Sequence, residues 1–222
     1  MAKLRLLFVK EEQASYISHL DLMRTFQRVF PRGGLELKHS QGFTPHPCLS
    51  IAMPLSVGVS SEYELADFEL EEGDETPIAQ IAARLDQVMP QGIHVVRTYP
   101  NGQKLKELKW LKARLTLIYD HGVPERAEDE LRDLFARPSL TVEKHSKKGP
   151  VEVDIQPMHR DTTIFREDAH TLILETVVSA QDPTLNPLLL ITAIETYLPQ
   201  YKADFTKCHR IRVYNRAMEP FT

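Results

Sequence analysis

The feature that most constrains this fold is an order of predicted elements that occurs twice. In the first half, "KLRLLFV" predicts a strand, and an apolar stripe on a helix follows it, formed by Leu22, Met23, Phe26, Val29 and Phe30. We expect Pro31 and the two following glycines to end this helix. The extended segments "LELKHS", "CLSIAMPL" and "EYELADFELEE" come next, before a helix over residues 76–89 and the strand "IHVVRTY". This order is the ferredoxin-like split βαβ pattern with an additional strand segment.

The second half repeats the order. "LKARLTLIYD" predicts a strand, "PERAEDELRDLFAR" and "PLLLITAIETYL" predict helices with extended segments between them, and "ADFTKCHRIRVY" predicts the last strand. Two short sequence matches fall at equivalent places in the two halves. Lys38-His39-Ser40 recurs at 144–146, and Met89-Pro90-Gln91 corresponds to Leu-Pro-Gln at 198–200. We therefore predict an α+β protein of two tandem ferredoxin-like (split βαβ) lobes related by internal duplication. The lobes are residues 1–98 and 112–222, joined by a linker at 99–111.

Composition narrows the function classes. Cys48 and Cys208, the two cysteines, lie far apart in sequence, which argues against a disulfide scaffold and fits a reducing, cytoplasmic compartment. No apolar run approaches the roughly 18 residues that span a bilayer, and the start does not resemble a signal peptide, so we expect no membrane contact. The chain has no cysteine cluster for an iron–sulfur centre, so we expect no cofactor of its own.

The net charge of −4 argues against binding driven mainly by phosphate contacts, and we expect no DNA partner. "NGQKLKELKWLKARL" and "EKHSKKG" are local basic segments that either contact nucleic acid or are solvated surface.

The stretch "SHLDLMRTFQR" supplies the first candidate site residues. Ser18 and Asp21 form a capping-box-like helix start. His19 and Asp21 are close enough to act as an oriented base or a proton relay, although capping already explains Asp21. Arg24 and Arg28, one turn apart, either grip a phosphate or carboxylate or belong to a solvated helix face.

The stretch "KHSQGFTPHPCLS" concentrates polar side chains around one aromatic residue. Gly42 permits backbone conformations closed to other residues, and the prolines on either side of His46 stiffen the segment. Polar groups on a stiff loop beside an aromatic ring indicate a ligand-binding site. With Arg24 and Arg28, the predicted ligand-binding residues are His39, Ser40, Gln41, Gly42, Phe43 and His46.

Two chemical readings of this stretch are weaker. His39, His46 and Cys48 are suitable metal ligands, but their spacing matches no zinc signature, so we predict no metal. Ser40 follows His39 directly, and neighbouring residues on a strand point to opposite faces, which argues against a nucleophile dyad.

The segments "YISHLDLMRTFQR", "LELKHSQGFTPHPCLSIAMPLSVGVSSEYE" and "KKGPVEVDIQP" resemble a bacterial radical-SAM-linked family of unknown function, DUF2344, over nearly the whole chain. The matching positions are Ser18, His19, Asp21, Arg24, Ser40, Gln41, Gly42, Phe43, Pro45, His46, Pro47, Pro54, Leu55, Gly58, Ser61 and Glu62. The resemblance implies a cobalamin-binding radical SAM protein as partner, which carries the iron–sulfur cluster, S-adenosylmethionine and cobalamin. It also implies proximity to genes for RNA processing and ribosomal proteins, and no established reaction.

Two departures from the family pattern affect the site. The helix ends in "FPRGG" where the family has an Arg-Arg-Ala-Gly-like end, so Arg32 stands alone and an arginine pair gripping an anion there is doubtful. Cys48 occupies a position where the family pattern has a basic residue, which weakens a thiolate role.

Three functions follow. The first is a non-catalytic partner of a radical SAM enzyme that presents a substrate such as tRNA or rRNA, with Phe43 stacking on a base. The second is an independent RNA enzyme, with His19 or His46 as acid or base and Asp21 as a further catalytic candidate, a reading that rests on fold analogy. The third is an interaction module without a ligand. "GFTPHP" has no counterpart in the second half, so Phe43, His46 and His19 are the stronger functional candidates.

Overall fold

The computed structural model describes residues 3–146 and 149–222, so Lys147 and Lys148 of the predicted basic segment lie outside the described residues. The chain divides into two compact units, Met1–Leu105 with Thr222, and Lys106–Phe221. The division falls within the segment 99–111 that we predicted as a linker, but strands enter that segment from both sides. Within the described ranges, no helix combines the length and apolar character that crossing a membrane requires.

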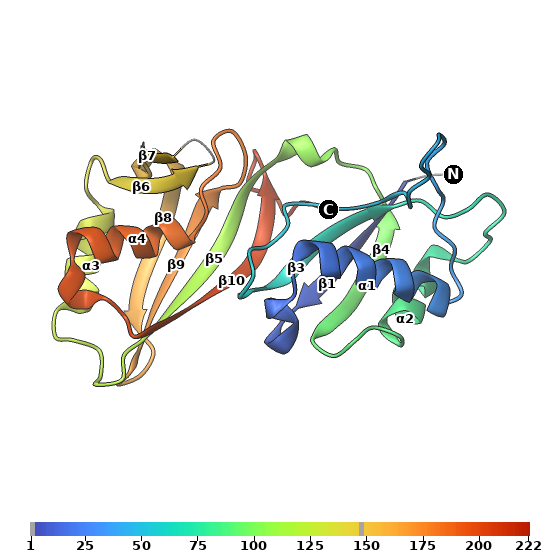
Figure 1. Ribbon diagram of the computed structural model, residues 1–222. Helices are drawn as coiled ribbons and strands as arrows, with labels where there is room; N and C mark the ends of the chain where they lie inside the picture. Colours follow the sequence, from blue (N-terminus) through green and yellow to red (C-terminus); the bar gives the residue numbers. More distant parts are fainter. Residues whose placement is uncertain (1–2, 147–148) are drawn as a thin grey trace. The chain divides into compact units, whose positions relative to one another are not determined.

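The first unit is a four-stranded antiparallel arrangement with two helices. Its elements are β1 (Leu4–Lys10), a 3-10 turn η1 (Glu12–Tyr16), α1 (His19–Arg32), β2 (Leu49–Ile51), β3 (Val59–Phe68), α2 (Ile78–Asp86) and β4 (Ile93–Pro100). The sheet order is β4-β1-β3 (Figure 1), and β2 pairs with β3 on the edge away from β1. Buried residues of both helices and of β1, β3 and β4 form one core.

The start of α1 follows the sequence prediction. The Ser18 hydroxyl accepts a hydrogen bond from the backbone N–H of Asp21 at 3.2 Å and donates to its carboxylate at 2.7 Å. The end differs, because α1 continues past Pro31 to Arg32. The N–H of Gly33 donates to the carbonyl of Val29 at 2.9 Å, so the backbone bond missing at the proline does not stop the last turn.

Two other predicted boundaries are corrected. The helix predicted over 76–89 is shorter, Ile78–Asp86, and residues 87–89 continue as hydrogen-bonded turns. The predicted strand "LELKHS" is reduced to isolated bridges that pair Leu37 with Leu70 and His39 with Pro47. Proline cannot donate to a strand ladder, so a continuous strand does not form there.

The second unit has the same kind of arrangement with one added hairpin. Its elements are β5 (Leu108–Ile118), α3 (Ala127–Phe135), β6 (Thr141–Ser146), β7 (Gly149–Asp154), β8 (His159–Arg166), β9 (Thr171–Ser179), α4 (Leu188–Tyr197) and β10 (Phe205–Asn215), with short 3-10 turns η2 (Leu105–Glu107) at its start, η3 (Gln156–Met158) and η4 (Pro199–Tyr201). Its main sheet runs β10-β5-β9-β8, all antiparallel, and β6 pairs only with β7. The chain is therefore a mixed α+β protein, as predicted.

Candidate functional site

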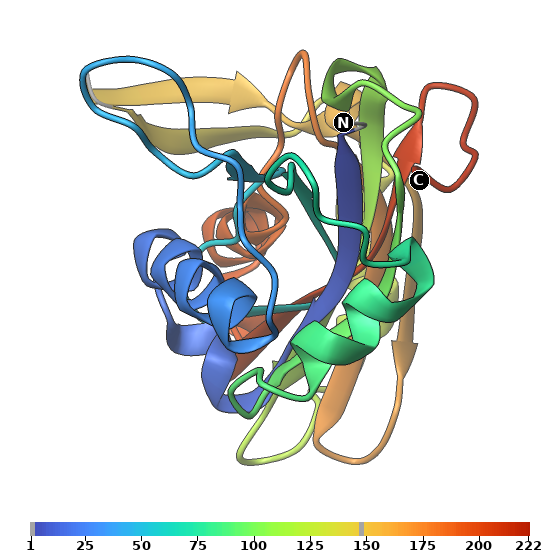
Figure 2. The ribbon, with the colours of Figure 1, turned by 90° about the vertical axis from the view of Figure 1, so that its right-hand side faces the viewer.

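Residues 38–48, which we call the motif loop, contain most of the predicted ligand-binding residues. Backbone hydrogen bonds close its base, from Cys48 N–H to the Lys38 carbonyl at 2.7 Å and from Ser40 N–H to the His46 carbonyl at 2.9 Å. The tip projects from the rest of the first unit in both ribbon views (Figures 1 and 2). The sequence-predicted cluster is therefore an exposed hairpin-like loop rather than the wall of a cleft.

Ser40 and His46 form hydrogen bonds with each other across the motif loop. The Ser40 hydroxyl lies 2.8 Å from His46 Nδ1 and accepts a hydrogen bond from the His46 backbone N–H at 3.1 Å. The serine thus contacts the histidine six residues later and not its neighbour His39. Among the described residues, no carboxylate contacts His46 to orient its ring, so the pair lacks the third group that an activated serine uses.

Phe43 lies at the tip of the motif loop and is fully exposed to solvent. Gly42, with φ at +141°, turns the backbone just before it. Lys38, at the base of the loop, lies 3.8 Å from Glu69, and residues 39–47 include no Lys, Arg, Asp or Glu. The tip is therefore an uncharged surface centred on one aromatic ring.

His19 lies away from the other two candidate histidines. It is the first residue of α1, whose 14 residues span about 21 Å before the chain turns towards the motif loop. His19 Nδ1 is buried and has no hydrogen-bond partner among the described residues. His39 and His46 share the motif loop, but among the side chains that the structure describes, those of residues 3–144 and 149–222, no group of three His, Cys, Asp or Glu is placed to hold a metal.

Asp21 serves the helix end. A hydrogen bond from the Ser18 hydroxyl, helped by the nearby Arg24 guanidinium at 3.2 Å, holds the pKa of the Asp21 carboxyl below its usual value. Asp21 therefore stays ionised as a cap, and Arg24 is engaged with it. Arg28 lies further along and, with Arg32, lines an open cavity of ≈ 310 Å³ beside Met89.

A second exposed surface forms where the segment around Gly58 contacts the segment around Ser15. The N–H of Gly58, in "PLSVGVSSE", donates to the Ser15 carbonyl at 2.9 Å, just before "YISHLDL". Three large apolar side chains on these segments are exposed: Tyr16 (66%), Leu20 (66%) and Val57 (59%). No local pattern of residues indicates this surface, because it depends on contacts between segments more than forty residues apart.

The second unit contains a histidine to which the sequence assigned no role. His159 is buried against the Phe135 ring, and its nitrogens contact Thr162 and Gln156 at 3.0 and 3.1 Å. Burial lowers its pKa below the usual value. It lines a cavity of ≈ 280 Å³ with Arg132, although its own hydrogen-bond partners already account for it as a structural residue.

This chain belongs to the family described as "Uncharacterized protein conserved in bacteria (DUF2344)", whose sequence model matches residues 3–187. Among curated proteins, no match is found.

Two solved structures match this chain over most of its length. One, "Crystal Structure of a Cbf5-Nop10-Gar1 Complex", has a TM-score of 0.48 and 12% identity, covering 95% of this chain and 48% of that one. The other, "Crystal structure of the archaeal box H/ACA sRNP Nop10-Cbf5 complex", has a TM-score of 0.45 and 13% identity, covering 93% and 46%. This chain spans about half the length of either matched chain.

Proposed function

We propose that this protein is a non-catalytic accessory partner of a cobalamin-binding radical SAM enzyme and helps it to act on an RNA substrate such as tRNA or rRNA. The sequence resemblance suggests the partner, which would carry the iron–sulfur cluster, S-adenosylmethionine and cobalamin. The observation that carries the proposal is Phe43, an aromatic ring held fully in solvent by a braced loop.

Several properties of the motif loop favour docking to a protein. A solvated phenylalanine gives no packing energy to its own fold, whereas an aromatic anchor inserted into a partner's pocket is a frequent source of binding energy. The Ser40–His46 contact and the two prolines limit the conformations that binding must freeze out. The tip has no cation for a phosphate, which favours an apolar protein pocket over a nucleic acid at this loop. Tyr16, Leu20 and Val57 supply a further apolar contact surface.

The Ser40–His46 hydrogen bond is the one feature that favours the second candidate, an RNA enzyme with a histidine acid or base. The geometry supports it less well. His46 lies on an exposed loop, and the α1 helix separates it from His19. General acid–base catalysis needs groups placed around one reacting atom, and these candidates do not converge.

We further propose that the two units are duplicated ferredoxin-like lobes. The strand order β4-β1-β3-β2 in the first unit corresponds, element by element, to β10-β5-β9-β8 in the second. In each unit the two helices connect equivalent strands, which is the split βαβ plan. The hairpin of β6 and β7 follows α3 just as the motif loop follows α1, which supports a duplicated framework that diverged at this position.

A binding experiment tests the docking role. The tagged chain is used to capture a purified cobalamin-binding radical SAM protein of the same organism, with nucleic acid removed. We expect Phe43→Ser to weaken binding at least about tenfold, the cost of a lost aromatic anchor. Val96→Ser, another exposed apolar position of the first unit, is the matched control and should bind as the wild type does. Equal capture by Phe43→Ser, or RNA cleavage by the isolated chain that is lost in His46→Ala, would overturn the proposal.

A further inference from the structure

The main sheet of the second unit has one covered and one open face. Along β5, Leu111, Ala113 and Leu115 are buried, whereas the alternate residues Lys112 and Arg114 face the other way. Figure 1 shows both helices of this unit on the same face of the sheet, and we assign the buried residues of β5 to that covered face. The opposite face of β5, β8, β9 and β10 is therefore left without a helix of its own unit, and we call it the open face.

Strand register identifies the other members of the open face. Arg114 of β5 pairs with His209 of β10 and with Glu175 of β9, and Glu175 pairs in turn with Thr163 of β8. Residues opposite one another on paired strands share a face, and so do residues two positions along. By this rule the residues on this face are Trp110, Lys112, Arg114, Thr116, Arg160, Thr163, Phe165, Ile173, Glu175, Val177, Lys207, His209, Arg212 and Tyr214. Ile173 and Val177 are buried, at 1% and 6% exposure, so they add no accessible surface to it.

The open face includes a guanidinium group stacked on an aromatic ring and a second, exposed aromatic ring. The Arg160 guanidinium lies 4.0 Å from the centre of the Trp110 ring, and Arg160 is 41% exposed at its side chain. Phe165, further along the same strand, is 40% exposed. The register places Arg160 and Phe165 four ladder positions apart, which is about 13 Å along a strand. A guanidinium plane and an open aromatic ring are both surfaces on which bases stack.

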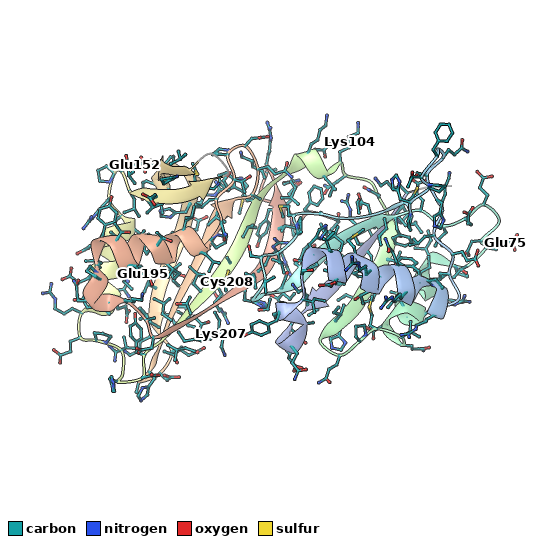
Figure 3. The ribbon with its side chains drawn as sticks, viewed as in Figure 1. Glu75, Lys104, Glu152, Glu195, Lys207 and Cys208 are labelled. Carbon is teal, nitrogen blue, oxygen red and sulfur yellow. The ribbon has the colours of Figure 1, made fainter. Side chains whose placement is uncertain are left out.

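The charge of the face is positive. Its acidic residue, Glu175, is held by Lys112 at 2.7 Å and by Arg114 at 2.5 Å, so the three side chains together carry a net positive charge. Partial burial would raise the pKa of Glu175, but the hydrogen bonds from these cations outweigh it and lower the pKa. Arg160 lies 3.9 Å from Asp161, a loose contact, and Lys207 is exposed on β10 (Figure 3).

From this arrangement we propose that the open face of the second unit binds single-stranded RNA, with the backbone drawn to Arg114, Lys112 and Lys207 and bases stacked on Phe165 and the Arg160–Trp110 pair. A four-stranded antiparallel sheet with aromatic residues on its free face can hold splayed bases, which a duplex does not offer. The net charge of −4 for the whole chain does not oppose this, because acidic residues gather elsewhere, for example in "AEDELRD" of α3. The choice of RNA over DNA rests on the proposed function, whereas the surface itself does not.

The chain contains a built-in reporter, because Trp110 is its single tryptophan. The full-length protein is titrated with an oligouridine of about 16 nucleotides, a length within the range that single-strand binders cover. We expect the Trp110 fluorescence to be quenched as RNA binds, and the apparent Kd to rise steeply with salt concentration. Oligodeoxythymidine of the same length should bind more weakly, and equal or tighter DNA binding would overturn the assignment to RNA.

Variants localise the site. We expect the double variant Arg114→Gln and Arg160→Gln to raise Kd at least about tenfold through lost phosphate and stacking contacts. Arg126→Gln with Lys202→Gln removes the same charge from exposed positions outside the open face and should change Kd less than about twofold. Phe165→Ser tests stacking without a change of charge. Equal losses in the two double variants, or no RNA binding by the wild type, would overturn the proposal.

The RNA-binding experiment and the protein-capture experiment can contradict their two proposals independently. RNA binding is measured on the chain alone, and the open face includes no residue of the motif loop. If Phe43→Ser leaves capture of the radical SAM protein intact while the open-face variants lose RNA, only the docking proposal fails. If the radical SAM protein is captured through Phe43 but no variant changes RNA binding, only the open-face proposal fails.

Discussion

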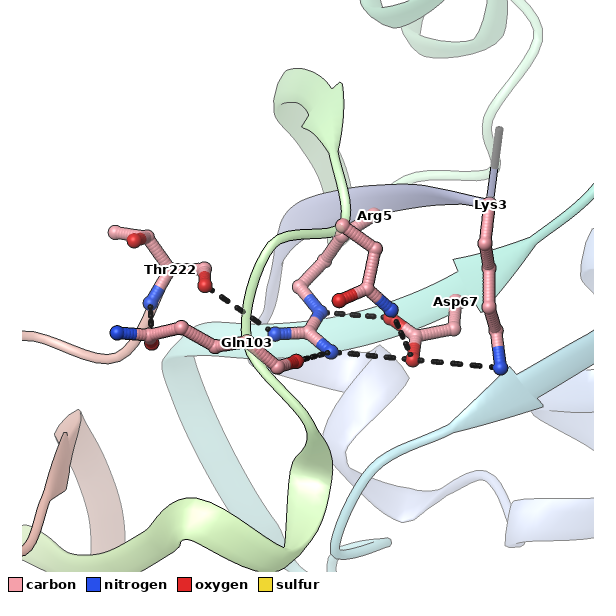
Figure 4. Close-up of polar contacts among 6 residues, drawn as sticks. Lys3, Arg5, Asp67, Gln103 and Thr222 are labelled. Carbon is pink, nitrogen blue, oxygen red and sulfur yellow. Dashed lines mark hydrogen bonds and ion pairs between the residues drawn. The ribbon is translucent and has the colours of Figure 1, made fainter. Parts of the chain in front are cut away.

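Arg5 on β1 and Asp67 on β3 face each other as a cross-strand pair and form a buried two-point contact, Nε to Oδ1 at 2.6 Å and Nη2 to Oδ2 at 3.1 Å. Nη2 also donates to the backbone oxygen of Gln103 at 3.0 Å, and Nη1 donates to that of Thr222 at 3.3 Å (Figure 4). Asn101 donates to the same carboxylate at 2.8 Å. One ion pair thus ties two central strands to the segment after β4 and to the last residue.

Removing the Asp67 carboxylate should destabilise the folded protein. We expect Asp67→Ala to lower the free energy of unfolding by roughly 3–5 kcal/mol, because the buried Arg5 guanidinium would lose the carboxylate that balances its charge. Lys3 lies 3.9 Å from the same carboxylate but is 52% exposed, so Lys3→Ala should cost less than about 1 kcal/mol. Urea unfolding measures both. Similar losses for the two variants would contradict the assigned importance of the buried pair.

Gly92 and Gly73 allow the cost of backbone strain to be distinguished from the cost of a steric clash. Gly92 and Gly73 both have positive φ, +82° and +99°. A Cβ at Gly92 would lie 2.7 Å from the Glu11 carbonyl oxygen, whereas a Cβ at Gly73 meets nothing within 4 Å. We expect Gly73→Ala to cost about 1–2 kcal/mol and Gly92→Ala about 2–5 kcal/mol, since overpacking adds to the strain. Equal shifts of the denaturation midpoint would show that the contact with Glu11 relaxes freely.

Asp154 predicts a pH dependence of stability. Backbone N–H groups of Leu140 and Gln156 donate to its carboxylate at 2.8 and 3.0 Å, and these bonds lower its pKa. A carboxyl with a lowered folded-state pKa stabilises the fold above its unfolded pKa of about 3.9, and the contribution is lost as pH falls through the folded value. Asp154→Asn should therefore melt below the wild type at pH 7 and approach it near pH 2.

The matched control for this titration is Glu152→Gln, an exposed position on the same strand (Figure 3). It should leave the pH dependence of the melting temperature as it is in the wild type. A constant gap between wild type and Asp154→Asn from pH 7 to pH 2 would contradict the role of the two backbone hydrogen bonds.

The two cysteines should differ in reactivity. Burial raises the pKa of the Cys208 thiol to about 12, although the nearby Arg210 acts in the opposite direction. Cys48, at the base of the motif loop, is only partly buried. At pH 8 a disulfide-exchange reagent should titrate one thiol in the native protein and two in denaturant. Cys48→Ser should leave no fast-reacting thiol, and rapid labelling of Cys208 in that variant would show that β10 opens.

Local features of this protein were predictable from sequence. The helix start at Ser18 follows from a side chain that caps within three residues, and the order of strands and helices follows from apolar periodicity. The polar cluster around Phe43 was also found, because its glycine and prolines restrict the backbone over a few positions. Boundaries were less accurate: α1 passed Pro31, and the strand predicted at 35–40 shrank to isolated bridges.

Contacts between distant residues were decided by the tertiary structure alone. Periodicity shows that Trp110 and Arg114 share a side of one strand, but only the pairing of β5, β9 and β8 brings Arg160 over the tryptophan ring. The same holds for Arg5 with Asp67. A side chain's direction is a local property with a period of two, whereas strand order and register depend on non-local pairing, and a shift of one residue would turn every side chain to the other face.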